Sequence, residues 1–272
     1  MHKKHFILMT FLIASITGGL FFFLGRTVER DIQEDIQEDL LQHQKEQIIY
    51  EVKENTQEKK ENCRPSVDKD AKNFVVGYGS LMNKESRMIT VPDAAFAAPV
   101  LVKNYERIWA SRGTKSKATY LLAVPQKDYI MNAIYYPTKA DDILSTDLRE
   151  ASYCRVKIDD KDLIPVGINR LPKGNYWMYV KKFSEAEFPN QEFPILQSYA
   201  DVFLAGCLQT QSEFNLTEFG KLCFTTTYNW DLANWVYDRS NPQYARYSDN
   251  TVNYKNQIDS IISRRGLDTP EK

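Results

Sequence analysis

The sequence predicts an α+β fold whose mixed or antiparallel sheet curls into a small barrel. Strand-like runs dominate the chain from residue 74 to residue 180, whereas most of the helical patterns follow after residue 197. Proline, glycine and Lys-Asp pairs separate the strand-like runs. A block of strands followed by a block of helices is typical of the α+β class.

Six runs rich in valine, isoleucine and tyrosine predict strands, because these side chains favour a pleated, half-buried surface. The runs lie at residues 74–76, 100–102, 120–124, 130–136, 153–158 and 176–180. Four helices are predicted from apolar residues at helical spacing, at residues 141–149, 197–208, 230–237 and 252–263. Thr138 is placed to cap the first of these helices.

The chain divides into six parts. Residues 6–25 carry no charge, and about 20 apolar residues of helix match the thickness of a bilayer. A cleaved signal peptide is the alternative, but the segment lacks a clear small-residue cleavage site. Lys3 and Lys4 favour a cytoplasmic N-terminus and an extracytoplasmic domain, that is, a single-pass membrane-anchored protein. The predicted parts are a cytoplasmic N-terminus (1–5), a transmembrane signal anchor (6–25), an acidic helical stalk (26–62), a linker (63–71), the globular domain (72–266) and a tail (267–272).

The stalk is strongly acidic, since residues 29–62 hold 11 acidic and 5 basic side chains without glycine or proline. Ile32, Ile36 and Leu40 recur at intervals of four residues and share one helical face. This pattern favours a solvated helix. Self-association as a coiled coil is the alternative, with a thin apolar seam.

Composition excludes several classes of function. The formal net charge is −1, with no basic stripe, which argues against nucleic-acid binding. The three histidines are His2, His5 and His43, so the globular domain has none for a Ser-His-Asp triad, a Cys-His dyad or a zinc site. Proton transfer would then fall to a carboxylate, lysine, tyrosine or cysteine. The sequence predicts neither a metal ion nor a cofactor.

The four cysteines are an even number, which allows one or two disulfides in an oxidising compartment. Buried free thiols are the alternative. The four cysteines are Cys63, Cys154, Cys207 and Cys223, and their spacing alone does not show which of them pair.

The turn Gly77-Tyr78-Gly79-Ser80-Leu81 follows the first predicted strand. Glycine permits close approach of another group to the backbone. A strand that ends in such a turn can present backbone N–H groups to an anion or an oxyanion. An ordinary strand–loop junction is the alternative.

Glu150 ends the predicted helix 141–149 and precedes a predicted strand. A carboxyl group that projects from this position into a cavity has a raised pKa, so that it can both accept and donate a proton near neutral pH. A surface carboxylate paired with a neighbouring arginine is the alternative.

Taken together, the motifs are similar to those of the gamma-glutamylcyclotransferase-like superfamily, between the gamma-glutamylcyclotransferases proper and the ChaC-like branch. The resemblance covers roughly residues 73–210. It rests on the turn, on Asn104-Tyr105-Glu106-Arg107-Ile108-Trp109, on the strand Asn132-Ala133-Ile134-Tyr135-Tyr136, and on Arg149-Glu150-x-x-Tyr153.

The resemblance implies a small mixed β-barrel with flanking helices that converts a γ-glutamyl peptide or amine into 5-oxoproline and a free amine. It implies Glu150 as the proton carrier. It also implies a substrate-binding set made of Val75, Val76, Gly77, Tyr78, Gly79, Ser80 and Leu81, together with Tyr199.

Three sequence features depart from the family. Asn132 precedes Ala133-Ile134-Tyr135, at a position that is often glycine in the family. Many cyclotransferases have asparagine after the serine of the turn. This chain has Leu81 there, and in this it is similar to the ChaC-like branch. Residues 225–230 and 237–244 match neither branch, and their aromatic side chains either cover the substrate or simply pack. Two other functions stay open, namely an inactive member of the fold that binds a ligand or partner, and transfer of the γ-glutamyl group to a second amine.

Overall fold

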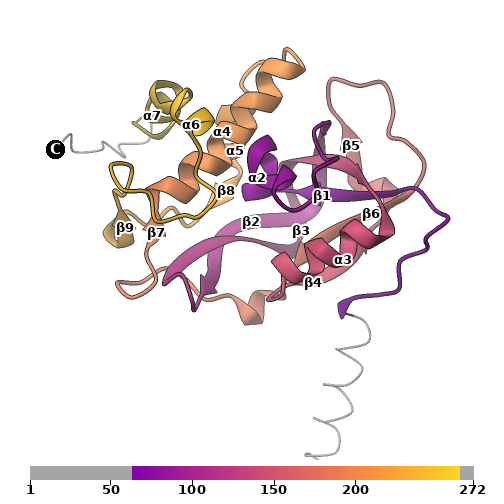
Figure 1. Cartoon of the computed structure of the whole chain (residues 1–272), viewed down its shortest axis with the longest axis horizontal. Helices are drawn as coiled ribbons and strands as arrows, with labels where there is room; N and C mark the ends of the chain where they lie inside the picture. The colour runs from indigo at the N-terminus through magenta and orange to yellow at the C-terminus, as the bar shows by residue number, and fades with distance from the viewer. Residues whose placement is uncertain (1–62, 264–272) are drawn as a thin grey trace, which may run out of the picture. The chain divides into compact units, whose positions relative to one another are not determined.

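The computed structural model describes residues 63–263 (Figure 1). The predicted anchor, stalk and tail lie outside these residues. Within residues 63–263, no helix is both long enough and apolar enough to cross a membrane.

A seven-stranded mixed sheet forms the centre of the described part. Its strands run in the order β4-β6-β1-β3-β2-β5, with β8 beside β2. β1 pairs in parallel with β6, and β2 pairs in parallel with β8, while the other pairs are antiparallel. The strands are β1 (Asn73–Gly77), β2 (Ala98–Gly113), β3 (Ala118–Thr138), β4 (Cys154–Ile158), β5 (Leu163–Pro165), β6 (Asn175–Val180) and β8 (Thr227–Tyr228).

The sheet curls because its two longest strands, β2 and β3, bend. The pairing register shifts between Lys103 and Tyr105 and again between Trp109 and Ser111, and such bulges increase local bending and twist. The curl brings β3 near the end of β6, where the Lys181 amide donates to the Ala123 carbonyl over 3.3 Å. No pairing within residues 63–263 joins the outer strands β4 and β5, so the predicted barrel is a curled, partly open sheet.

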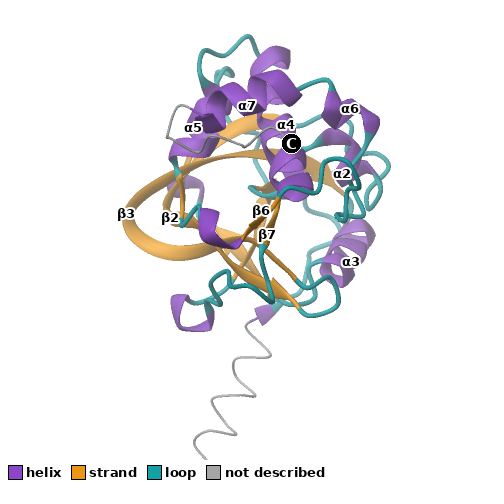
Figure 2. Ribbon diagram, turned by 90° about the vertical axis from the view of Figure 1, so that its left-hand side faces the viewer, coloured by secondary structure: helices purple, strands orange, loops and turns teal. Residues whose placement is uncertain are grey.

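Helices flank the sheet. In two views at right angles, α4 to α7 gather on one side of the curled strands, and α3 lies apart from them (Figures 1 and 2). A second, two-stranded sheet pairs β7 (Ile195–Leu196) with β9 (Trp235–Val236). The helices are α2 (Lys84–Met88), α3 (Ala140–Arg149), α4 (Gln197–Glu213), α5 (Phe219–Thr225), α6 (Asp249–Val252) and α7 (Lys255–Ser263), with short 3-10 turns at η1 (Ser80–Met82), η2 (Asp160–Asp162), η3 (Phe183–Glu185) and η4 (Leu232–Asn234).

Several sequence predictions need correction. The segments 120–124 and 130–136 belong to one strand, β3, whose polar middle is exposed rather than turned. The predicted helix 230–237 is wrong, because the chain forms η4 and then pairs β9 with β7. The predicted helix 252–263 is confirmed for its larger part as α7, but its start is wrong, because Val252 belongs to α6 and Asn253 is the C-cap of α6. Thr138 does not cap α3, whose N-cap is Lys139 without a side-chain bond.

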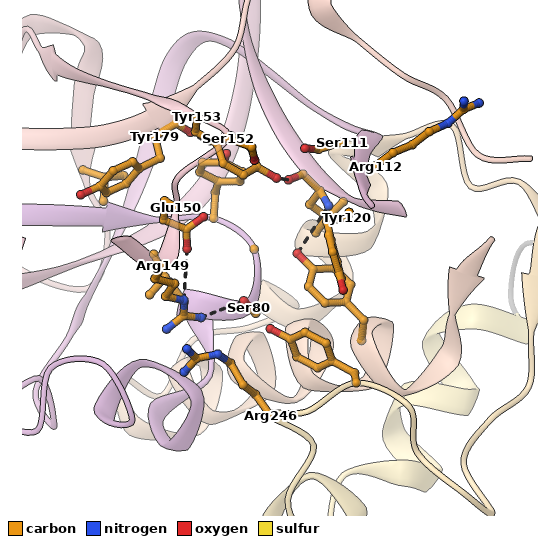
Figure 3. A pocket seen from close by; sticks show the side chains of 18 residues that line it. Ser80, Ser111, Arg112, Tyr120, Arg149, Glu150, Ser152, Tyr153, Tyr179 and Arg246 are labelled. Carbon is orange, nitrogen blue, oxygen red and sulfur yellow. Dashed lines mark hydrogen bonds and ion pairs between the residues drawn. The ribbon is translucent and has the colours of Figure 1, made fainter. Parts of the chain in front are cut away.

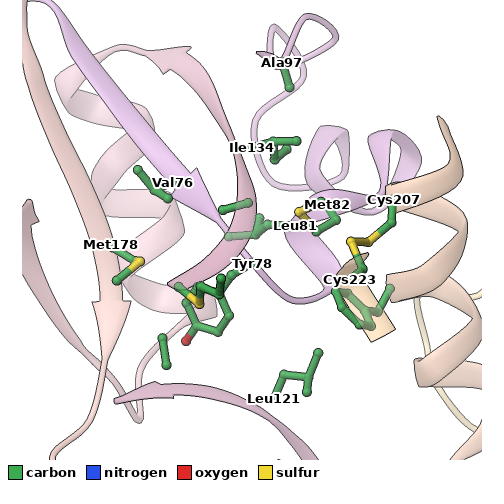
Figure 4. Packing of buried hydrophobic residues seen from close by; sticks show 14 of the residues in the cluster. Val76, Tyr78, Leu81, Met82, Ala97, Leu121, Ile134, Met178, Cys207 and Cys223 are labelled. Atoms are coloured by element: carbon green, nitrogen blue, oxygen red, sulfur yellow. A yellow bond between two sulfur atoms is a disulfide. The ribbon is translucent and has the colours of Figure 1, made fainter. Parts of the chain in front are cut away.

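In the hydrophobic core, the segment that follows β1 packs against α4 (Figure 4). Met82 and Cys207 are fully buried there, and Leu81 is nearly so. A disulfide between Cys207 and Cys223 links α4 to α5. The segment that carries the Gly-Tyr-Gly-Ser turn is therefore held against a helix that is buried on almost all sides.

Gly206 permits this close packing of α4 against η1. A Cβ atom at residue 206 would lie 2.3 Å from the Asn83 amide nitrogen and 2.4 Å from the Met82 carbonyl carbon. Both neighbours are backbone atoms, so they cannot rotate away as a side chain can.

We expect Gly206→Ala to lower the free energy of unfolding by about 1–3 kcal/mol, since overpacking outweighs the better helix propensity of alanine. Urea denaturation measures the change. Gly220→Ala in α5 is the matched control, because its added Cβ would meet mainly the Leu208 side chain, which can shift. Equal or greater stability of Gly206→Ala would contradict the packing described.

Candidate active site

A pocket of about 310 Å³ opens where the turn after β1, the end of α3 and the start of α4 meet (Figure 3). Residues from the start of β3 and from the loop before α6 complete its wall. The lining residues are Val76, Tyr78, Gly79, Ser80, Leu81, Ser111, Arg112, Gly113, Tyr120, Leu121, Arg149, Glu150, Ser152, Tyr153, Tyr179, Tyr199, Tyr244 and Arg246.

The two glycines of the turn each sit where a side chain would collide. A Cβ at Gly77 would lie 2.7 Å from Leu81 Cβ, and a Cβ at Gly79 would lie 2.9 Å from the Tyr199 hydroxyl. The Tyr78 hydroxyl donates to the Tyr179 carbonyl and so ties the turn to β6. Among the described residues, the amide nitrogens of residues 79–81 donate no hydrogen bond, so these N–H groups lack a partner within residues 63–263.

Arg107 supports the turn from behind. Its buried guanidinium donates to the Tyr78 carbonyl at 3.2 Å and to the Asn132 carbonyl at 2.7 Å. It also donates to Thr227 and to the carbonyl of Cys223. Burial lowers the pKa of Arg107 to about 9. These bonds fix the turn relative to β3 and to the segment after α5.

Glu150 lies directly after α3 and lines the pocket beside the turn. Its Oε1 is 3.1 Å from Arg149 Nε, and 18% of its side chain is exposed. Burial raises the pKa of Glu150, whereas the nearby Arg149 and Arg246 oppose the rise. The ion pair with a neighbouring arginine therefore exists, but in a largely buried setting.

Arg149 connects Glu150 to the turn. Its guanidinium donates to Ser80 Oγ at 2.9 Å, to the Ser86 carbonyl at 2.9 Å and to Thr90 Oγ1 at 3.1 Å. Both the ion pair and the bond to Ser80 are visible in Figure 3. Because one side chain holds both groups, the carboxylate and the turn keep a fixed separation.

An aromatic wall faces these charged groups. The rings of Tyr120 and Tyr199 are 4.9 Å apart, and those of Tyr199 and Tyr244 are also 4.9 Å apart. Tyr153 donates from its hydroxyl to the Leu121 carbonyl at 3.1 Å. These tyrosines and Glu150 line the same pocket.

The segment after β9 is pinned to the first turn of α4. Asp238 accepts from the Ser198 amide at 2.8 Å and from the Ser198 hydroxyl at 2.6 Å. Asp238 also accepts from the Gln243 amide, and Ser198 Oγ accepts from the Tyr244 amide. This network places Tyr244 and Arg246 at the pocket.

The structure brings most of the predicted site residues together. Glu150, Tyr199 and five residues of the turn line one pocket, namely Val76, Tyr78, Gly79, Ser80 and Leu81. Val75 and Gly77 do not line it, because Val75 is fully buried in β1 and Gly77 packs against Leu81.

Sequence reasoning missed Tyr244 and Arg246. The one available signal was the aromatic segment 237–244, which reaches the pocket with Tyr244.

No family model matches the sequence, and no curated protein matches it either. Among solved structures, a gamma-glutamyl cyclotransferase is similar with a TM-score of 0.45 and 12% identity, covering 70% of this chain and 98% of that one. YkqA from Bacillus subtilis is similar with a TM-score of 0.42 and 15% identity over 55% of this chain, which spans about half, 52%, of YkqA. A gamma-glutamyl cyclotransferase specific to glutathione, from yeast, is similar with a TM-score of 0.34 and 13% identity, covering 57% of this chain and 97% of that one.

Two of these neighbours are described as gamma-glutamyl cyclotransferases, the family whose motifs the sequence resembles. At TM-scores below 0.5 and identities of 12–15%, these likenesses say nothing about activity, which we infer from the site itself.

The site combines a carboxyl group of raised pKa with free backbone amides in a partly enclosed pocket. Such a carboxyl group can accept and then return a proton. The amides can stabilise negative charge that develops on an oxygen atom. A proton carrier and donors that stabilise negative charge are the groups that acyl transfer needs, and neither is a histidine here.

The raised pKa of Glu150 has a consequence for stability. The unfolded chain loses this proton near the ordinary value of 4.5, whereas the folded protein keeps it to higher pH. We therefore expect the free energy of unfolding of the wild type, relative to Glu150→Gln, to fall as the pH rises from 4.5 through the raised pKa. Urea denaturation of both proteins over a pH series measures the difference. A difference that grows with pH would mean that the two arginines stabilise the ionised form more than burial disfavours it.

Proposed function

We propose that the domain is a cyclotransferase that releases 5-oxoproline and a free amine from a γ-glutamyl peptide or amine. The observation that carries the proposal is the position of Glu150, which lines the same pocket as Gly79 and Ser80 and has a raised pKa. A carboxylate that faced bulk solvent would not support it.

In this proposal the substrate supplies its own nucleophile. The α-amine and the γ-carbonyl belong to one molecule, so the site must mainly hold the folded conformer. Glu150 takes a proton from the α-ammonium group, and the freed nitrogen attacks the γ-carbonyl carbon. Negative charge then develops on the carbonyl oxygen, where the amides of residues 79–81 can stabilise it.

The collapse of this intermediate breaks the bond between the γ-carbon and the departing nitrogen. The attacking nitrogen loses two protons in all, since an ammonium becomes a lactam N–H. The departing nitrogen gains two and leaves as an ammonium. Glu150 carries both protons in sequence and ends unchanged, so that one carboxyl group serves as base and acid.

A product assay tests this proposal. We expect the purified full-length protein to release 5-oxoproline from at least one member of a panel of γ-glutamyl dipeptides, γ-glutamyl amines and glutathione. Glu150→Gln should lower kcat by about 10²–10⁴-fold, because it removes the proton carrier. Mass spectrometry quantifies the product.

Glu213→Gln is the matched control, since Glu213 is exposed at the end of α4 and does not line the pocket. Absence of 5-oxoproline from every substrate, with a folded protein, would contradict the cyclotransferase function. Formation of a new γ-glutamyl amide from an added amine would indicate transfer to a second amine instead. Binding without any product would indicate an inactive member of the fold.

We further propose that residues 6–25 anchor the chain in a membrane with the domain on the extracytoplasmic side, and that the stalk allows self-association. All four cysteines fall within the described residues and are paired, as Cys63–Cys154 and Cys207–Cys223. Disulfides persist in oxidising compartments, which supports this location.

The compartment can be checked by thiol labelling. In protein taken from its host under denaturing conditions without reductant, we expect no cysteine to react with a maleimide until a reducing agent is added. Four reactive thiols before reduction would argue for a reducing compartment and against the proposed orientation.

A further inference from the structure

The charged side chains that line the pocket are unbalanced. They are three arginines, Arg112, Arg149 and Arg246, and one carboxylate, Glu150. Arg112 points away from the centre of the pocket and donates to the Phe188 carbonyl (Figure 3). Two guanidinium groups therefore face a single carboxylate, and the pocket carries an excess of positive charge.

Arg149 and Arg246 converge on one atom. Both donate to the Ser86 carbonyl oxygen, at 2.9 Å and 3.0 Å, so their guanidinium groups lie side by side. Two like charges held this close repel each other, and an anion between or beside them would relieve the repulsion.

The two arginines differ in how many partners they have. Arg149 donates to Ser80, Ser86 and Thr90 and pairs with Glu150, so the protein already uses its guanidinium fully. The bond to Ser86 is the one hydrogen bond of the Arg246 side chain to another described residue, and no carboxylate of residues 63–263 pairs with it. Arg246 is thus a cation at the pocket with donors to spare.

Hydrogen bonds and an ion pair fix the segment that precedes Arg246. The Asp238–Ser198 network fixes the backbone amides of Gln243 and Tyr244. Arg239, on the same segment, forms a bidentate ion pair with Asp201 of α4 at 2.6 Å and 2.8 Å. Because residues 238–244 are held against α4, Arg246 is positioned at the pocket.

We propose that Arg246 binds a carboxylate of the substrate and thereby determines its specificity. The inference rests on the proposed function, and it restricts the substrate to γ-glutamyl compounds that present a carboxylate close to the reacting nitrogens.

Two carboxylates of a γ-glutamyl amino acid meet this condition. The α-carboxylate shares a carbon with the attacking amine, and the carboxylate of the leaving amino acid is equally close to the departing nitrogen. Glu150 must reach both nitrogens, and Arg149, which pairs with Glu150, lies beside Arg246. Either carboxylate can therefore reach Arg246, and the chemistry that recognises them is the same.

Three substrates separate the two sources. γ-Glutamyl-alanine has both carboxylates, γ-glutamyl-ethylamide lacks that of the leaving group, and 4-aminobutyryl-alanine lacks the α-carboxylate and would give 2-pyrrolidinone. KM and kcat are measured for the full-length wild type and for Arg246→Gln. We expect KM to rise by about 10–100-fold for substrates that keep the bound carboxylate, with kcat little changed, because a charge-assisted hydrogen bond is lost.

The pattern identifies the carboxylate. If Arg246 binds the α-carboxylate, the variant loses affinity for the first two substrates and not for the third. If it binds the leaving-group carboxylate, the first and third substrates are affected and the ethylamide is not. An equal change for all three substrates, or no change, would overturn the inference, since a merely structural role cannot distinguish them.

Two further variants serve as controls. Arg246→Lys should recover part of the affinity, because the positive charge is kept. Arg170→Gln removes an exposed arginine outside the pocket and should leave all three substrates unaffected.

A binding measurement separates this inference from the proposed function. Calorimetry with γ-glutamyl-alanine compares Glu150→Gln with Glu150→Gln/Arg246→Gln, and it needs no turnover. Binding that depends on Arg246 supports the inference even if the wild type forms no 5-oxoproline. Unchanged binding in the double variant, or no binding to Glu150→Gln, would overturn it even if the wild type is active.

Discussion

The guanidinium of Arg149 holds together three parts of the candidate site that the sequence keeps apart. It pairs with Glu150 at the end of α3, donates to Ser80 in the turn after β1, and donates to Ser86 in α2. These bonds connect the buried carboxylate directly to the glycine-rich turn. Catalysis by a single carboxyl group depends on a fixed separation between them, since the same group must reach two nitrogens.

A second layer of buried contacts supports this arrangement. Arg107 fixes the carbonyl of Tyr78 from behind, and α4 packs against η1 through Gly206. The Cys63–Cys154 disulfide attaches the start of the described chain to β4, and Arg64 donates to the Glu150 carbonyl at 3.2 Å. The loop that carries Glu150 is thus held from both sides, which favours a preorganised pocket over one that forms on binding.

Local patterns in the sequence predicted the elements that local physics determines. The apolar run of β1 and the helical spacing of α3 placed the turn and Glu150 at element ends, where they are found. The prediction of two separate strands at 120–124 and 130–136 was wrong, because the polar residues between them are an exposed part of one continuous strand and not a turn. The helix expected at 230–237 was wrong because pairing with β7 and the bonds from Asp238 to α4 outweigh local propensity. No local sequence pattern predicted that Arg246 lies at the site, because only the long-range contacts of its segment bring it to the pocket.

A crystal structure of Glu150→Gln with a γ-glutamyl dipeptide bound would test the proposed site most directly. We predict that the γ-carbonyl oxygen lies within hydrogen-bond distance of the amides of residues 79–81, and that the α-amine faces the side chain of residue 150. A ligand bound elsewhere, or bound in the pocket with its γ-carbonyl directed away from the turn, would contradict the central claim that this turn and Glu150 form one catalytic site.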